Sequence, residues 1–212
     1  MATGIVVIDP GHGGTQDIGG SDANHAVSPS GVLEKAMTLQ MGLLVRDGLV
    51  GAVGHHIKVF MTRTTDTNLS LPARANVAKT NRANLFLSIH FNGFNAVARG
   101  VETLVRPVSR GNVNHAEDLS FALKIQRRVF AAISARDAHT ANRGVKDQVL
   151  GVLDDVALGN TAASHPCKAC LLEIEFIDVP AVDQLLNTGP NAAAARQDIA
   201  NAIRDAIIEA LT

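Results

Sequence analysis

The sequence predicts a single α/β domain: one central sheet of about six strands, mostly parallel or mixed, with helices on both faces. First, short apolar runs rich in β-branched residues alternate along the chain with amphipathic stretches of helical period. Second, a length of 212 residues suits one domain with a substantial core. Third, no internal repeat, linker or shift in composition divides the chain. We therefore expect residues 1–212 to form one domain.

The chain opens with a strand, a long loop and a helix. The apolar residues 5–8 (Ile-Val-Val-Ile) predict a buried strand, which Asp9-Pro10-Gly11 must end. Residues 13–31 are rich in Gly, Ser, Asp and Asn and predict a functional loop. A helix with its apolar residues on one face then begins near Val32.

The next segment predicts a strand, a helix and two further strands. Residues 57–62 form the second strand. Ser70 as cap and Pro72 in the tolerant first turn predict a helix that follows it. Residues 85–91 are apolar enough for a central strand, and residues 100–106 predict a fourth strand.

A helix is predicted from about residue 115 to 135, because Asn114 and Glu117 resemble a capping box. The polar residues 136–166 predict loops, interrupted only by a short apolar run. Residues 169–177 predict the last strand, and residues 192–211 an amphipathic helix with an apolar residue at every fourth position.

The composition excludes several classes of protein. A net charge of -1 and an apolar fraction of 46% exclude a disordered chain. The charges are mixed and no aromatic residues accompany a basic cluster, so we expect no nucleic-acid partner. No apolar run reaches the ~18 residues of a membrane span, so we expect no membrane insertion. Cys167 and Cys170 cannot build a disulfide framework, which leaves free thiols or one local disulfide.

Three residues that can bind a metal occupy comparable places in the predicted fold. His12 lies between glycines after the first strand, Glu34 in the first turn of the next helix, and His90 at the end of the strand 85–91. Two imidazoles and one carboxylate, with a fourth position left to water, are typical of a catalytic zinc site. The same set suits non-haem iron, but nothing in the sequence suggests redox chemistry. The helix dipole alone would also favour Glu34.

The last strand carries two carboxylates in an otherwise apolar segment. Glu173 and Glu175 are two residues apart, so the strand period predicts that they share a face. A carboxylate near an activated water could take its proton and deliver it to a leaving amine. Glu173 lies nearer the apolar part of the strand, where desolvation would raise its pKa. The structural alternative for Glu173 is a salt bridge to a surface lysine.

A series of motifs then carries a family resemblance. In order along the chain they are Ile8-Asp9-Pro10-Gly11-His12-Gly13-Gly14, Glu34-Lys35, Thr62-Arg63 with Asp66, Leu71 with Arg74 and Asn76, Leu85-Phe86-Leu87-Ser88-Ile89-His90-Phe91-Asn92, Arg143-Gly144-Val145-Lys146, and Leu172-Glu173-Ile174-Glu175-Phe176-Ile177. Together they resemble the zinc-dependent N-acetylmuramoyl-L-alanine amidases of the Amidase_3 family. One departure is Asp178-Val179, where the family usually has Ser-Asn.

The resemblance implies a ligand set and a base. It places one Zn²⁺ on His12, Glu34 and His90, and the catalytic role on Glu173 rather than on its rival Glu175. Asn92 either contacts substrate or only ties down the turn after its strand. We expect Arg63 and Arg74 to anchor loops through carboxylates and carbonyls. A second zinc on His165, Cys167 and Cys170 is disfavoured, because a structural site needs a fourth ligand.

The resemblance further implies cleavage of the amide between the lactyl group of N-acetylmuramic acid and the L-alanine of the peptidoglycan stem. We expect a monomeric catalytic domain without a separate wall-binding module, acting in the periplasm or cell wall. No signal peptide follows Met1. This favours either a phage endolysin released at lysis or the isolated catalytic domain of a bacterial autolysin. The alternatives are a zinc carboxypeptidase acting on the peptide and a catalytically silent peptidoglycan-binding module.

Overall fold

A six-stranded mixed sheet forms the centre of the protein, which is known from a computed structural model that describes residues 1–159 and 166–212. The strand order is β2-β1-β3-β6-β4-β5, and β4 runs antiparallel to β6 while every other neighbouring pair is parallel. The strands are β1 (Thr3–Pro10), β2 (His56–Met61), β3 (Leu85–Asn92), β4 (Val101–Val105), β5 (Asn142–Asp147) and β6 (Lys168–Phe176). The predicted fold class is confirmed.

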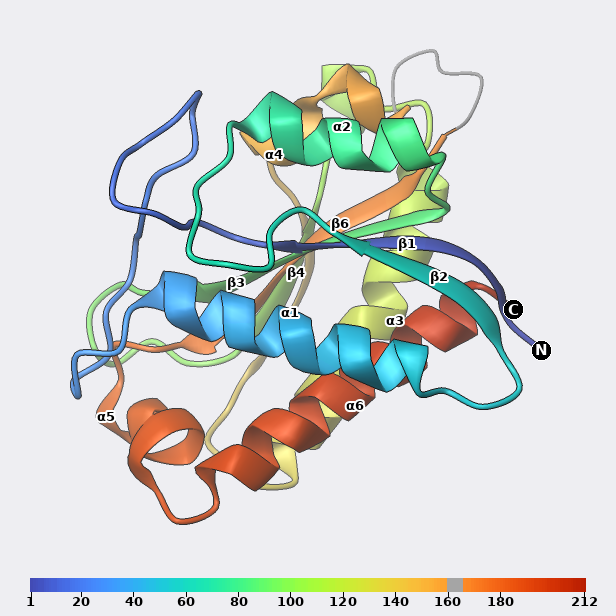
Figure 1. The fold of residues 1–212 in the computed structure, drawn as a ribbon. Coiled ribbons are helices and arrows are strands. Elements are labelled where there is room, and N and C mark those ends of the chain that lie inside the picture. The colour runs from blue at the N-terminus through green and yellow to red at the C-terminus, as the bar shows by residue number, and fades with distance from the viewer. Residues whose placement is uncertain (160–165) are drawn as a thin grey trace.

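Helices cover the two faces of the sheet unequally (Figure 1). One face, called here the thick face, packs against α1 (Glu34–Val50), α3 (His115–Ser134) and α6 (Ala192–Ala210). The opposite, thin face packs against α2 (Leu71–Asn81) and the four-residue α4 (Gly151–Asp154). The remaining helical segments are short: Val108–Arg110, Val156–Leu158, α5 (Pro180–Asp183) and a π turn over Gln184–Thr188.

Strand alternation assigns side chains to these two faces. On β3, Leu87 and Ile89 belong to the thick-face core, whereas Phe86 belongs to the thin-face core. His90, four residues after Phe86, lies on the thin face by the two-residue period of a strand. The small helices of this face leave room at the carboxyl ends of β3 and β6. No helix within the described ranges is both long and apolar enough to cross a bilayer.

Two expectations from the sequence are corrected. The segment assigned to loops contains the edge strand β5, whose residues are mostly exposed and lack apolar alternation. The predicted capping box before α3 is absent, because the Asn114 side chain makes no cap bond. Its amide instead donates to Asp118 Oδ1 at 3.1 Å and to the Cys167 carbonyl at 3.2 Å.

Candidate metal centre

His12, Glu34 and His90 converge at the carboxyl ends of β1 and β3. One potential ligand atom from each lies within 4.8 Å of the other two. Glu34 Oε1 lies 3.1 Å from His12 Nε2 and 3.1 Å from His90 Nδ1. The residues come from a loop, the first residue of α1 and the end of β3, so they meet only through the tertiary fold.

Glycine and backbone geometry position the two imidazoles. A Cβ at Gly11 would lie 2.2 Å from His90 Cε1, so only glycine leaves room for that ring. His12 has a φ of 60° and Gly13 a φ of 132°, which turns the chain sharply after β1. His12 Nδ1 donates to the Asp22 carbonyl at 3.0 Å, and this leaves Nε2 free to face Glu34.

The carboxylate of Glu34 is held in a buried position. It is 1% exposed, and its two oxygens also accept hydrogen bonds from the backbone N–H groups of Ala26 and Phe91, each at 3.1 Å. Burial acts to raise its pKa, but the hydrogen bonds and charges of His12 and His90 outweigh burial and hold the pKa well below its ordinary value. Burial likewise acts to lower the pKa of His12, and Glu34 reverses this and raises it.

The donor set fits a divalent metal ion. Two imidazole nitrogens and one carboxylate oxygen match the three protein ligands of catalytic zinc sites, and the same set suits iron. Each ligand also has a further hydrogen-bond partner or packing surface that fixes its orientation, which is typical of metal sites. The structure therefore supplies a candidate metal centre without specifying the ion.

Glu173 lies beside this centre, on the strand next to that of His90. The two residues are register partners across β3 and β6. Glu173 is half-buried, and its Oε2 is buried with no hydrogen-bond partner in the part of the chain that the structure describes. Burial raises the pKa of Glu173 well above its ordinary value, and the nearby charges of Glu34 and Glu102 raise it further. No lysine within the described residues pairs with it.

Glu175 has a different environment. The register shifts between His90–Glu173 and Asn92–Phe176, so the two-residue period is interrupted beyond Glu173. The fully buried Glu175 accepts hydrogen bonds from Arg99 Nε at 3.1 Å and from Thr140 Oγ1 at 2.7 Å. The sequence-based expectation of a shared face is therefore wrong, and Glu175 anchors neighbouring segments.

A buried network supports the loop that carries His12. Asp9 is 1% exposed and pairs with Arg74 at 2.9 Å, and Arg74 donates to the His12 carbonyl at 2.7 Å. Arg63 donates to the carbonyls of Pro10 and Gly11 at 2.9 and 2.8 Å. Both arginines thus anchor loops, as the sequence predicts: Arg74 bonds a carboxylate and carbonyls, and Arg63 bonds carbonyls.

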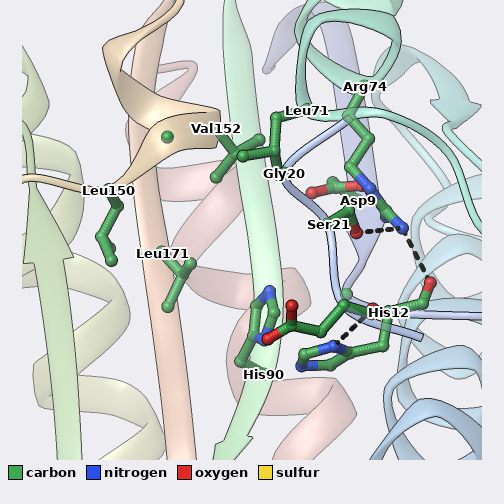
Figure 2. A pocket seen from close by; sticks show the side chains of 13 residues that line it. Asp9, His12, Gly20, Ser21, Leu71, Arg74, His90, Leu150, Val152 and Leu171 are labelled. Carbon is green, nitrogen blue, oxygen red and sulfur yellow. Dashed lines mark hydrogen bonds and ion pairs between the residues drawn. The ribbon is translucent and has the colours of Figure 1, made fainter. Parts of the chain in front are cut away.

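A cavity of about 220 Å³ adjoins the two imidazoles on the thin face. Figure 2 shows His12 and His90 along one part of it, with Asp9, Ser21 and Arg74 nearby. Its apolar lining consists of Leu71, Leu150, Val152 and Leu171. The side chains of His12 and His90 are 10% and 18% exposed, so they reach this space from an otherwise buried cluster.

Comparison with known proteins agrees with this geometry. Residues 6–208 match the family model Amidase_3, described as N-acetylmuramoyl-L-alanine amidase. The chain belongs to this family. It is 30% identical over 235 residues to the N-acetylmuramoyl-L-alanine amidase AmiA of Escherichia coli K12, with 96% of this chain and 75% of AmiA covered. It is 32% identical over 184 residues to an uncharacterised cell wall amidase of Bacillus anthracis, with 82% and 30% covered.

A solved amidase structure confirms the fold. The catalytic domain of CwlV, an N-acetylmuramoyl-L-alanine amidase from Bacillus (Paenibacillus) polymyxa, superposes with a TM-score of 0.75 at 26% identity. The match covers 97% of this chain and 96% of the CwlV domain. The chain spans about a third or less of the first curated relatives, at 30%, 31% and 21% of their lengths. It therefore corresponds to one part of those longer proteins.

Within this Amidase_3 domain, the hydrogen-bond partner of Asn92 is Glu102, a residue that the sequence analysis missed. Asn92 Nδ2 donates to Glu102 Oε1 at 2.8 Å, so its amide ties β3 to β4. Glu102 is 8% exposed and is a register partner of Glu173. In the sequence, Glu102 stands out only as a single acidic residue inside the apolar segment 101–105. That signal is weak, because only the sheet order brings Glu102 beside Glu173.

The departure at Asp178 and the two cysteines have different structural roles. Asp178 Oδ2 accepts hydrogen bonds from the N–H groups of Phe94 and Ala96 at 3.0 and 2.8 Å, so it shapes the loop after β3. Cys167 and Cys170 are buried free thiols, and burial raises the pKa of both. His165, the third residue of the disfavoured second zinc site, lies outside the described residues.

Proposed function

We propose that this domain is a zinc-dependent peptidoglycan amidase that cleaves the bond between N-acetylmuramic acid and the L-alanine of the stem peptide. The observation that carries the proposal is the convergence of His12, Glu34 and His90 next to Glu173, whose Oε2 has no hydrogen-bond partner among the described residues. Membership of the Amidase_3 family supports the substrate and the bond. Zinc is preferred to iron because amide hydrolysis needs no redox step.

In this mechanism His12, Glu34 and His90 hold one zinc ion. When bound, the ion supplies Lewis-acid chemistry, which acidifies water and polarises a carbonyl oxygen. Glu34 contributes the negative charge of the ligand set, and its hydrogen bonds to the Ala26 and Phe91 N–H groups keep it in place. The Asp22 carbonyl keeps the proton of His12 on Nδ1, so that Nε2 remains a ligand.

Glu173 acts as the proton carrier. Its carboxylate accepts a proton from the attacking water, and the protonated acid then donates it to the nitrogen of the departing L-alanine. Its environment differs from that of an exposed carboxylate, because burial and the charges of Glu34 and Glu102 raise its pKa well above its ordinary value and so favour uptake of a proton. The Oε2 atom has no internal partner that would compete for the proton.

The remaining features of the proposal concern the whole protein. We propose that residues 1–212 are one monomeric catalytic domain that acts on peptidoglycan outside the cytoplasm. Asn92 contributes to substrate binding mainly by holding Glu102, to which it donates at 2.8 Å. An endolysin and an autolysin would both use this chemistry, so the origin of the chain does not alter the mechanism.

Product analysis of digested cell walls tests the proposal. Purified sacculi are treated with the protein, with and without EDTA, and new chain ends are identified. We expect free L-alanine amines that appear only without chelator and return on addition of Zn²⁺. Released D-alanine would instead identify a carboxypeptidase. Wall binding without any new end would identify a silent binding module and overturn the proposal.

A further inference from the structure

A charged cluster lies beside Glu173 on the side away from the metal centre. Its core is Glu102, whose Oε2 accepts hydrogen bonds from Arg143 Nε at 2.8 Å and Lys146 Nζ at 2.5 Å. The two cations lie on the edge strand β5 and are called here the Arg143–Lys146 pair. Neither cation takes part in the proposed proton transfer or metal binding.

Strand register places this cluster in line with the metal centre. His90, Glu173, Glu102 and Gly144 are successive register partners across β3, β6, β4 and β5. Neighbouring strands are about 4.8 Å apart, so Glu102 is about 10 Å from His90 along the row. A substrate whose scissile amide lies at His90 can reach the cluster by extending across the sheet.

A β-bulge directs Arg143 onto the thin face. The register shifts between Val101–Asn142 and Glu102–Gly144, so Arg143 is the extra residue of β5. Gly144 has a φ of 78°, which permits this bulge. The Arg143 guanidinium lies 5.1 Å above the centre of the Phe176 ring, which holds it over the sheet.

The Arg143–Lys146 pair has positive charge and hydrogen-bond donors that Glu102 does not use. Two cations share one carboxylate, so the cluster carries one excess positive charge. The side chains of Arg143 and Lys146 are 34% and 44% exposed. Within the described residues, only Nε of Arg143 donates a hydrogen bond, which leaves its two terminal nitrogens available. A half-exposed guanidinium with free donors suits a carboxylate ligand.

We propose that the Arg143–Lys146 pair binds a carboxylate of the stem peptide, on the second or third residue after the cleaved amide. The inference rests on the proposed amidase function. The glycan strand is neutral once its lactyl carboxyl is bound in the amide, so the free carboxylates of this substrate belong to the peptide. An extended peptide advances about 3.4 Å per residue, so the span of about 10 Å corresponds to roughly three residues.

Four soluble substrates test the inference and identify the carboxylate. All are N-acetylmuramoyl tripeptides that begin with L-alanine: the second residue is isoglutamate or isoglutamine, and the third is diaminopimelate or lysine. The terminal α-carboxyl of the third residue is blocked as an amide in all four, so that they differ only in the carboxylates under test. If the recognised carboxylate is on the second residue, kcat/KM should be about tenfold higher for the isoglutamate substrates than for the isoglutamine substrates. If it is on the third residue, kcat/KM should be about tenfold higher for the diaminopimelate substrates than for the lysine substrates. The preference should appear mainly in KM, because the contact is remote from the reacting atoms.

Variants assign that preference to the two cations. Arg143→Gln and Lys146→Met should each reduce the preference, and the double variant should abolish it. Arg143→Lys should restore part of it, since it keeps the charge but loses the planar fork. The matched control is Lys124→Met on α3, a half-exposed lysine that contacts Ser120 and should leave the preference unchanged. Thermal melting of each variant identifies any loss of folding.

The outcomes separate this inference from the proposed function. Equal cleavage of all four substrates by the unaltered protein overturns the inference alone. A preference that persists in the folded double variant also overturns it, because the selectivity must then arise elsewhere. If neither the tripeptides nor sacculi are cleaved in the presence of Zn²⁺, the proposed function is overturned and the inference with it.

Discussion

The two faces of the sheet differ in the side chains that cover them: one face is an apolar core, and the other carries the polar candidate site. On the thick face, Leu87 and Ile89 of β3 join an apolar core with α1, α3 and α6. On the thin face, Ser88 of the same strand donates to Asp9 Oδ2 at 2.7 Å, and His90 faces Glu34. Because side chains alternate along β3, its apolar residues join the thick-face core and its polar residues join the candidate site on the thin face. Burial of apolar surface on the thick face stabilises the fold. This stabilisation offsets the free-energy cost of the buried charges on the thin face.

The largest effect is expected from removing a metal ligand on the thin face. His12→Ala and His90→Ala should each lower the bound zinc, measured by atomic emission, and reduce amidase activity at least about 10³-fold. Zinc should raise the melting temperature of the unaltered protein, because it binds only the folded state, and this rise should shrink in both variants. His139→Ala, at an exposed position, is the matched control. Full zinc content in either variant would remove that residue from the ligand set.

Glu173→Gln should separate catalysis from metal binding on the same face. The amide retains the shape of the side chain but cannot carry the proton, so kcat should fall about 10²- to 10⁴-fold while zinc content is retained. The melting temperature should not fall, because the change removes a buried negative charge that lies close to the charges of Glu34 and Glu102. Glu209→Gln on α6 is the control. Comparable turnover in Glu173→Gln would refute its assignment as the proton carrier.

Much of the candidate metal centre could be predicted from the sequence because its residues follow local signals. His12 comes directly after an apolar strand, and Glu34 begins a helix with an apolar face. His90 and Glu173 interrupt apolar strands. The pattern of a strand predicts where it ends, and the carboxyl ends of parallel strands meet at one edge of the sheet.

The Glu102 cluster could not be predicted in the same way. Its assembly depends on the sheet order β6-β4-β5 and on the bulge at Arg143, and both are set by contacts between distant segments. The strand β5 has no apolar alternation because it lies at an exposed edge. Asn114 failed as a predicted cap for a partly related reason, since its amide donates to the carbonyl of the distant Cys167 as well as to Asp118 in the same helix.

Asp9→Asn should weaken the buried network beneath the thin-face site. It leaves Arg74 buried without its anionic partner, and breaking such a pair costs about 3–5 kcal/mol in the free energy of unfolding. Urea denaturation at pH 7 measures this cost. Asp198→Asn, in an exposed pair with Arg136, is the control and should cost less than about 1 kcal/mol.

The pH dependence of that cost has a defined sign. Burial acts to raise the pKa of Asp9, but Arg74, Thr62 and Ser88 outweigh it, and the folded-state pKa lies below the ordinary value. The stabilisation is thus fully present above the unfolded pKa of about 3.9 and is lost as the pH falls through the lower folded pKa. The difference in unfolding free energy between the unaltered protein and Asp9→Asn should narrow at acid pH. A constant difference would contradict this account.

The smallest effect is expected on the thick face, where Ile203→Val in α6 shortens a fully buried side chain. The loss of one methyl group should cost about 0.5–1.5 kcal/mol in the free energy of unfolding, measured by urea denaturation. Because the sheet lies between α6 and the thin face, kcat and zinc content at 25 °C should stay unchanged while the protein is folded. Leu123→Val, an exposed position on α3, should change neither quantity. A loss of kcat in fully folded Ile203→Val would show that packing on the thick face sets the geometry of the site, and the division between the two faces would then be wrong.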